Sequence, residues 1–209
     1  MLLSHTHKFI FVKTRKTAGT SIEVDLSKFM SDEDIVTPII PEEPGHIPRN
    51  FQWEDRKYSS KNKFYNHMPA IEIESKVGDR IYNSYFKFCV EREPIDKCVS
   101  HYSMKRNSPT HNAKTRNLSW EKYVMAGDFP IDTDKYTDQK GNLIVDRIIR
   151  FENLENEISD LSKKLNIGLE TITTRAKSGF RTEVDVTPEQ KERIYSAFES
   201  SNRFTGYEI

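Results

Sequence analysis

The strongest constraint on the fold is a repeated order of a short apolar run, a polar turn and a helical pattern. An apolar run at 9–12 leads through a polar turn into residues that recur at helical spacing. The same order returns at 85–102, where Pro94 opens the helix, and again at 145–165. Strands that alternate with helices favour a parallel sheet covered on both faces, with ligands bound beyond the carboxyl ends of the strands. The sequence therefore predicts an α/β fold with its polar turns on one rim.

Length and charge limit the number of domains and the class of partner. The 209 residues suffice for one well-buried domain and are too few for two ordinary domains joined by a linker. Lysine plus arginine and aspartate plus glutamate number 32 each, so the chain as a whole has no electrostatic footprint for nucleic acid. The first residues lack a cleavage site and an apolar span of ~20 residues, which predicts no membrane association. Cys89 and Cys98 are expected to be buried free thiols, which suits a cytoplasmic protein.

The first polar turn, residues 13–21, has the composition of an anion site. It places three cationic side chains, several hydroxyls and one glycine before a helix N-terminus, whose N–H groups and positive dipole end attract anions. Alone, the turn is also compatible with a solvated basic loop that caps its helix. A P-loop kinase or NTPase needs Gly-x-x-x-x-Gly-Lys-Ser/Thr, but here Lys16 comes before Gly19. The turn therefore predicts anion binding without the P-loop pattern.

The second polar turn offers a different kind of phosphate ligand. Arg92 follows the second strand, and Ser100 lies in the helix after it. An arginine that leaves a strand presents a planar fork of donors to a phosphate, and a serine hydroxyl adds one more. Taken alone, Arg92 is equally well explained as a partner in a surface ion pair. If both turns share one rim, they form a two-part anion site.

Both turns resemble motifs of the sulfotransferase superfamily, whose members use 3′-phosphoadenosine-5′-phosphosulfate (PAPS). Thr17-Ala18-Gly19-Thr20-Ser21, preceded by Lys16, resembles the 5′-phosphosulfate loop, although Arg15 stands where the family usually has proline. The segment from Arg92-Glu93-Pro94 to Ser100-His101-Tyr102 resembles the 3′-phosphate motif. Arg150–Leu154 and Phe204–Tyr207 resemble elements of the carbohydrate-type, family 2-like branch. The resemblance implies a single sulfotransferase domain over 1–209 with a three-layer, P-loop-like α/β fold, in which helices flank a central, mostly parallel sheet.

The resemblance also implies roles for individual residues. Lys16 is expected at the oxygen that leaves with the nucleotide, and no metal is expected. A basic loop before the C-terminal helix is expected to close over the nucleotide, with an exposed loop as the alternative. Glu152 is interpreted as a structural hydrogen-bonding group. The expected cofactor-binding residues are Arg15, Lys16, Thr17, Ala18, Gly19, Thr20, Ser21, Arg92, Ser100, Lys177, Ser178, Gly179 and Arg181.

Sulfuryl transfer to a hydroxyl needs a base, and position distinguishes the six histidines as candidates for this role. His67 resembles the histidine that serves as base in relatives acting on polysaccharide hydroxyls, and a helix-capping histidine is the alternative. The other five are disfavoured. His5 and His7 lie near the amino end of the first strand, His101 is expected to point away from the site, and His46 and His111 lie in irregular loops.

The sequence thus predicts transfer of a sulfuryl group from PAPS to a small-molecule or saccharide hydroxyl, with Lys16 and His67 as catalytic residues. A Mg²⁺-dependent nucleotide kinase and a non-catalytic nucleotide-binding protein on the same fold remain as alternatives. Loop aromatic residues suggest stacking surfaces for a sugar. These residues are Trp53, Tyr58, Phe64, Tyr65 and Trp120.

Overall fold

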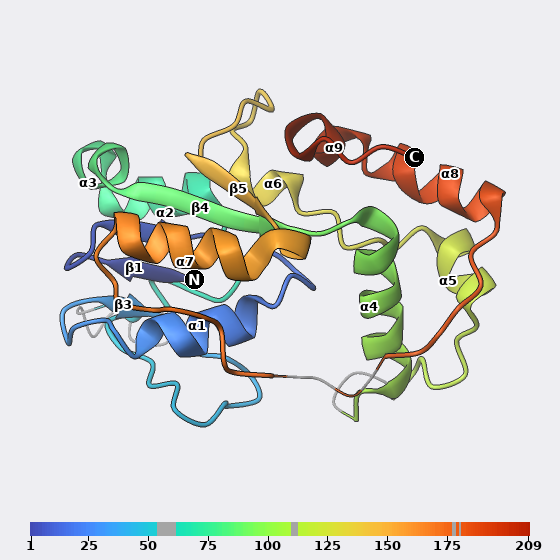
Figure 1. Ribbon diagram of the computed structural model, residues 1–209, viewed down its shortest axis with the longest axis horizontal. Helices are drawn as coiled ribbons and strands as arrows, with labels where there is room; N and C mark the ends of the chain where they lie inside the picture. The colour runs from blue at the N-terminus through green and yellow to red at the C-terminus, as the bar shows by residue number, and fades with distance from the viewer. Residues whose placement is uncertain (54–61, 110–112, 177–178, 180) are drawn as a thin grey trace.

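The computed structural model describes residues 1–53, 62–109, 113–176, 179 and 181–209. Its centre is a five-stranded sheet in the order β3-β1-β2-β4-β5 (Figure 1). The pairs β2–β4 and β4–β5 are parallel, whereas β1 is antiparallel to both β2 and β3. Four of these strands therefore run in one direction, which confirms the predicted, mostly parallel sheet. The strands are β1 (Leu2–Ser4), β2 (Phe9–Phe11), β3 (Ile35–Val36), β4 (Phe86–Glu91) and β5 (Arg147–Arg150).

Helices cover both faces of this sheet, as the alternation of strands and helices predicts. Successive strand residues point to opposite faces, and on one face Phe9 and Phe11 pack with residues of α1 and α7. On the other face Ile10 and Cys89 pack with residues of α2, α3 and α6. The helices in question are α1 (Gly19–Ser27), α2 (Ala70–Val77), α3 (Asp79–Ser84), α6 (Thr133–Tyr136) and α7 (Leu154–Lys164), with the short 3-10 helix η2 (Phe151–Asn153) ahead of α7.

A further group of helices lies off the sheet, beyond the carboxyl end of β4 (Figure 1). Their apolar side chains form a separate core that includes Tyr102, Tyr123 and Phe198. This group is α4 (Pro94–Asn107), α5 (Trp120–Ala126) and α8 (Pro188–Ala197), and α9 (Glu199–Thr205) follows α8. The helix after β4 thus extends the molecule past the rim instead of covering a sheet face, so the rim becomes the floor of a cleft.

Local signals set several helix ends. The Thr187 side chain and the Gln190 side chain form a capping box at the start of α8. Ser119 caps α5, which ends at Gly127 in the left-handed region. Strand β1 has no comparable signal, because three residues are too few to show a period. Among the described residues, no helix is long and apolar enough to cross a membrane.

Candidate functional site

A cleft of about 1150 Å³ opens at the carboxyl ends of β2 and β4. The turn after β2 and the start of α1 form one wall, and α4 forms another. The start of α7, residues 172–176, Gly179 and Arg181 close a further side. Both polar turns therefore lie on one rim, as predicted. The predicted residues that line the cleft are Arg15, Lys16, Ala18, Gly19, Thr20, Ser21, His67, Arg92, Ser100, Gly179 and Arg181. Lys177 and Ser178 lie outside the described residues.

The turn before α1 presents a helix N-terminus to the cleft. Lys16 and Ala18 have φ angles of 62° and 59°, a left-handed region that non-glycine residues rarely adopt. Ala18 is the N-cap, which makes no side-chain cap hydrogen bond, and the first turn of α1 holds no acidic residue. A Cβ atom at Gly19 would lie 2.7 Å from Cγ of Lys13, so the Lys13 stem would have to shift to admit any larger residue. The geometry fits an anion held by backbone N–H groups.

Two of the three cations of this turn are held by buried carboxylates. Lys13 is 3% exposed, and its Nζ lies 2.6 Å from Oε2 of the fully buried Glu23. Burial alone would raise the pKa of Glu23, but the ammonium groups of Met1 and Lys13 lower it to about 2. Arg15 is held by the fully buried Asp132, with 2.8 Å between Nε and Oδ1. Lys16 lines the cleft beside them, and its backbone oxygen accepts from NH1 of Arg92 at 3.1 Å.

The hydroxyl groups of the turn divide between the cleft and the interior. Thr20 and Ser21 line the cleft. Thr17 does not, because its side chain is fully buried and its Oγ1 lies 2.9 Å from Oγ1 of Thr14 and donates to the Thr14 carbonyl at 3.2 Å. The Thr17 hydroxyl therefore stabilises the turn from inside, and the role of Thr17 in cofactor binding stays a prediction.

The second turn brings two arginines to one carboxylate. Nε of Arg92 donates to Oδ2 of Asp96 at 2.5 Å, and NH2 of Arg181 donates to Oδ1 of Asp96 at 2.5 Å. The Arg92 guanidinium also lies over the Phe151 ring, 4.1 Å from its centroid. Ser100 lines the cleft one helical turn beyond Asp96. Arg92, Arg181 and Ser100 thus converge from separate segments at one place where a phosphate can bind.

His67 lines the same cleft in a tautomer suited to a base. Its Nδ1 lies 3.1 Å from the backbone oxygen of Lys13. A carbonyl oxygen only accepts, so Nδ1 carries the hydrogen and Nε2 is left to accept a proton. Burial first and the Lys13 charge second lower the pKa of His67 to about 4, so the ring is neutral near pH ~7. His67 does not cap α2, because the N-cap is Pro69.

His101 lines the cleft, whereas the sequence predicts that it points away from the site. Its Nδ1 lies 3.0 Å from the hydroxyl of Tyr123. Burial first and Lys105 second lower its pKa to about 4. The misassignment follows from the position of α4, because a helix beyond the sheet rim turns a different face to the site than a helix packed on the sheet.

The remaining histidines do not line the cleft among the described residues. Nδ1 of His5 lies 2.7 Å from the hydroxyl of Tyr85, and Nε2 of His7 lies 3.1 Å from the backbone oxygen of Phe29. Nε2 of His46 is buried with no hydrogen-bond partner among the described residues. His111 lies outside the described residues.

Two acidic residues position the far side of the cleft. Asp25 accepts from the backbone N–H groups of Thr173 and Thr174, at 2.7 and 2.8 Å, which ties the segment 172–176 to α1. Glu152 accepts from the backbone N–H of Glu93 at 2.9 Å and from the Tyr207 hydroxyl at 2.5 Å. Glu152 thus makes the hydrogen bonds expected of a structural group, and it also lines the cleft.

Comparison with known proteins agrees with this geometry. A family model described as "Sulfotransferase family" matches residues 1–204. An uncharacterized protein of Archaeoglobus fulgidus is 34% identical over 123 residues, which span 54% of this chain and 98% of that protein. The match with the family model includes both polar turns and His67.

Proposed function

The chain belongs to the sulfotransferase family, and from that membership we propose that it moves the sulfuryl group of PAPS to a hydroxyl acceptor. The observation that carries the proposal is the shared cleft. The N-terminus of α1 with Lys16, the pair Arg92 and Ser100, and the proton-accepting Nε2 of His67 all face one space. The same cleft can therefore bind PAPS and take the proton from an acceptor hydroxyl beside it.

Two anion subsites support the donor assignment. The N-terminus of α1, with Lys16, Thr20 and Ser21 beside it, suits the 5′-phosphosulfate because backbone N–H groups and a helix dipole favour negative charge. Arg92 and Ser100 suit the 3′-phosphate through charge-assisted hydrogen bonds. Arg181 joins them through its contact with Asp96. The 3′-phosphate would compete with Asp96 for these guanidinium groups.

The proposed reaction is an in-line displacement at sulfur. The acceptor oxygen bonds to sulfur as the bond between sulfur and the bridging oxygen of the 5′-phosphate breaks. Nε2 of His67 takes the acceptor proton, and its neutral state at pH ~7 makes it available for that step. The bridging oxygen leaves with the bonding electrons, and the Lys16 ammonium stabilises its charge. The nucleotide product is the 3′,5′-bisphosphate of adenosine (PAP).

The acceptor is proposed as a saccharide or another small hydroxyl compound. Of the aromatic residues suggested as stacking surfaces, Phe64 and Trp120 are buried in the core, 2% and 5% exposed. Tyr65 is 38% exposed and donates its hydroxyl to Glu72 at 2.7 Å. Tyr58 lies outside the described residues. The cleft wall that can meet an acceptor instead includes Ile40, Pro41 and Glu43.

The test is release of PAP from PAPS in the presence of panels of saccharides, phenols and peptides. We expect turnover by the natural chain in EDTA, and loss of turnover by Lys16→Ala. Stabilisation by ATP that depends on Mg²⁺ would favour a nucleotide kinase instead. Binding of PAP without turnover on any acceptor would favour a non-catalytic nucleotide-binding protein.

A further inference from the structure

Asp132 is a buried carboxylate that grips the turn carrying Lys16. It is fully buried, and its Oδ2 accepts from the backbone N–H of Arg15 at 2.8 Å. Its Oδ1 accepts from Nε of Arg15, also at 2.8 Å. NH2 of Arg15 donates to the neighbouring backbone oxygen of Ile131 at 2.7 Å. Backbone and side chain of Arg15 are therefore both fixed by a segment 117 residues further along the chain.

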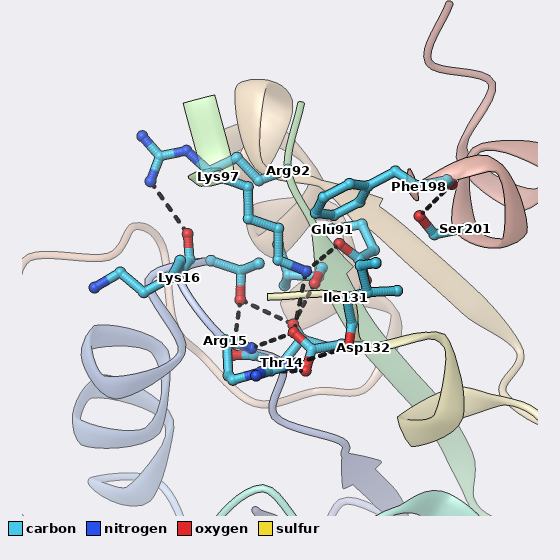
Figure 2. Close-up of polar contacts among 12 residues, drawn as sticks. Thr14, Arg15, Lys16, Glu91, Arg92, Lys97, Ile131, Asp132, Phe198 and Ser201 are labelled. Atoms are coloured by element: carbon cyan, nitrogen blue, oxygen red, sulfur yellow. Dashed lines mark hydrogen bonds and ion pairs between the residues drawn. The ribbon is translucent and has the colours of Figure 1, made fainter. Parts of the chain in front are cut away.

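A buried lysine joins this grip to the strand of the second turn. Nζ of Lys97 lies 3.0 Å from Oδ2 of Asp132 and 2.7 Å from Oε2 of Glu91, and Lys97 is fully buried (Figure 2). The group holds two cations, Lys97 and Arg15, and two carboxyl groups, and burial raises the pKa of Glu91. Loss of one member leaves a buried charge without its partner, which is costly in a protein interior. Lys97 therefore links Asp132 to the strand that carries the second turn.

The contacts form a closed ring that connects the two polar turns (Figure 2). Arg15 directly precedes Lys16, whose backbone oxygen accepts from NH1 of Arg92 at 3.1 Å. Glu91 directly precedes Arg92, so the ring runs from Glu91 through Lys97 and Asp132 back to Arg15. Lys16 itself has a left-handed backbone, which persists only where the surroundings hold it. Asp132 and Arg92 hold it from its two sides.

Arg15 is also the point where this chain departs from the motif that it resembles. A proline at this position fixes φ but has no N–H to donate. Arg15 supplies that N–H, and Asp132 receives it. On the basis of the function proposed above, we infer that Asp132 is a positioning residue for sulfuryl transfer. Through Arg15 it fixes Lys16 against the leaving oxygen. Arg15 is part of this clamp and does not itself bind PAPS.

The clamp is tested with Arg15→Gln and Asp132→Asn, with Asp128→Asn as the matched control. Asp128 lies in the same segment, pairs with Lys105 and is 63% exposed. Misplacement of Lys16 acts in the transition state, so we expect both clamp variants to lower kcat about 10- to 100-fold. The Kd for PAP, from calorimetry, should stay within about threefold of the natural value. The control should match the natural chain in both quantities.

The results for the variants and for the natural chain distinguish failure of the clamp from failure of the proposed function. Arg15 is 39% exposed, so Arg15→Gln is expected to fold even if Asp132→Asn does not. A natural kcat in a folded Asp132→Asn variant would overturn the clamp, and a natural kcat in a folded Arg15→Gln variant would overturn the part that the Arg15 side chain plays in it. A PAP Kd more than about tenfold weaker in that variant would make Arg15 a ligand and would also overturn it. If the natural chain neither binds PAP nor turns over PAPS, the proposed function is wrong. If the natural chain turns over PAPS and both clamp variants have the same kcat, only the clamp is wrong.

Discussion

Replacement of His67 by asparagine tests whether the ring is neutral and buried as the proposed base requires. Asparagine suits the site because His67 has a φ of 60°, which asparagine tolerates better than most residues. Its amide can also donate to the Lys13 carbonyl in place of Nδ1. The variant thus removes the titrating ring with little backbone strain, which alanine would not do.

The expected pH effect follows from the depressed pKa. The folded protein lowers the pKa of His67 from 6.5 to about 4, so the unfolded chain takes up a proton first as the pH falls. The stabilisation by the neutral ring is complete above pH ~6.5 and is lost as the pH falls towards ~4. Between pH ~7 and pH ~5 this loss amounts to about 2 kcal/mol. His101 shifts in the same direction but is present in both proteins, so their difference isolates His67.

Urea unfolding at the two pH values, followed by tryptophan fluorescence, measures this difference. The natural chain should lose about 2 kcal/mol more stability than His67→Asn between pH ~7 and pH ~5. Parallel losses in the two proteins would refute the buried, neutral ring. As a functional control at pH ~7, the variant should bind PAP normally and turn over PAPS about 10²- to 10⁴-fold more slowly.

Three further substitutions have defined outcomes. Arg92→Ala should weaken PAP binding about 10- to 100-fold by calorimetry, and equal affinity would remove its 3′-phosphate role. Asp96→Asn should tighten PAP binding about threefold to tenfold, because the carboxylate that competes for Arg92 and Arg181 is gone; weaker binding would make Asp96 a support for the arginines instead. Gly19→Ala should cost about 1–3 kcal/mol in urea unfolding, because its Cβ would press on the buried Lys13 stem, and an unchanged midpoint would contradict the close approach.

The sequence predicts the sheet and its rim because their signals are local. Apolar runs such as Tyr85–Val90 and the capping residues around Thr187 specify strands and helix ends within a few positions. The two polar turns then fall on one rim by the topology of a parallel sheet. Most residues that line this part of the cleft are therefore found from sequence, whereas the internal position of the Thr17 hydroxyl and the contact of Asp132 with Arg15 are not.

Residues set by distant packing could not be found in this way. Asp132 lies in a polar segment without periodicity, and its partners Arg15 and Lys97 are remote in sequence. Nothing local distinguishes it from the exposed Asp134 two residues later. The place of His101 could not be predicted for the same reason. Its direction depends on the position of α4 beyond the sheet, and the separate core around Tyr123 sets that position.

The binding of PAP in EDTA tests the shared two-phosphate cleft most directly. At a concentration about 100 times its Kd, PAP should stabilise the chain by about 2.7 kcal/mol, or about 5–10 °C in Tm. Adenosine 5′-monophosphate, which lacks the 3′-phosphate, should give a much smaller shift at the same concentration. No shift with millimolar PAP, or a shift that requires Mg²⁺, would contradict a cleft that holds both phosphates of a sulfuryl donor.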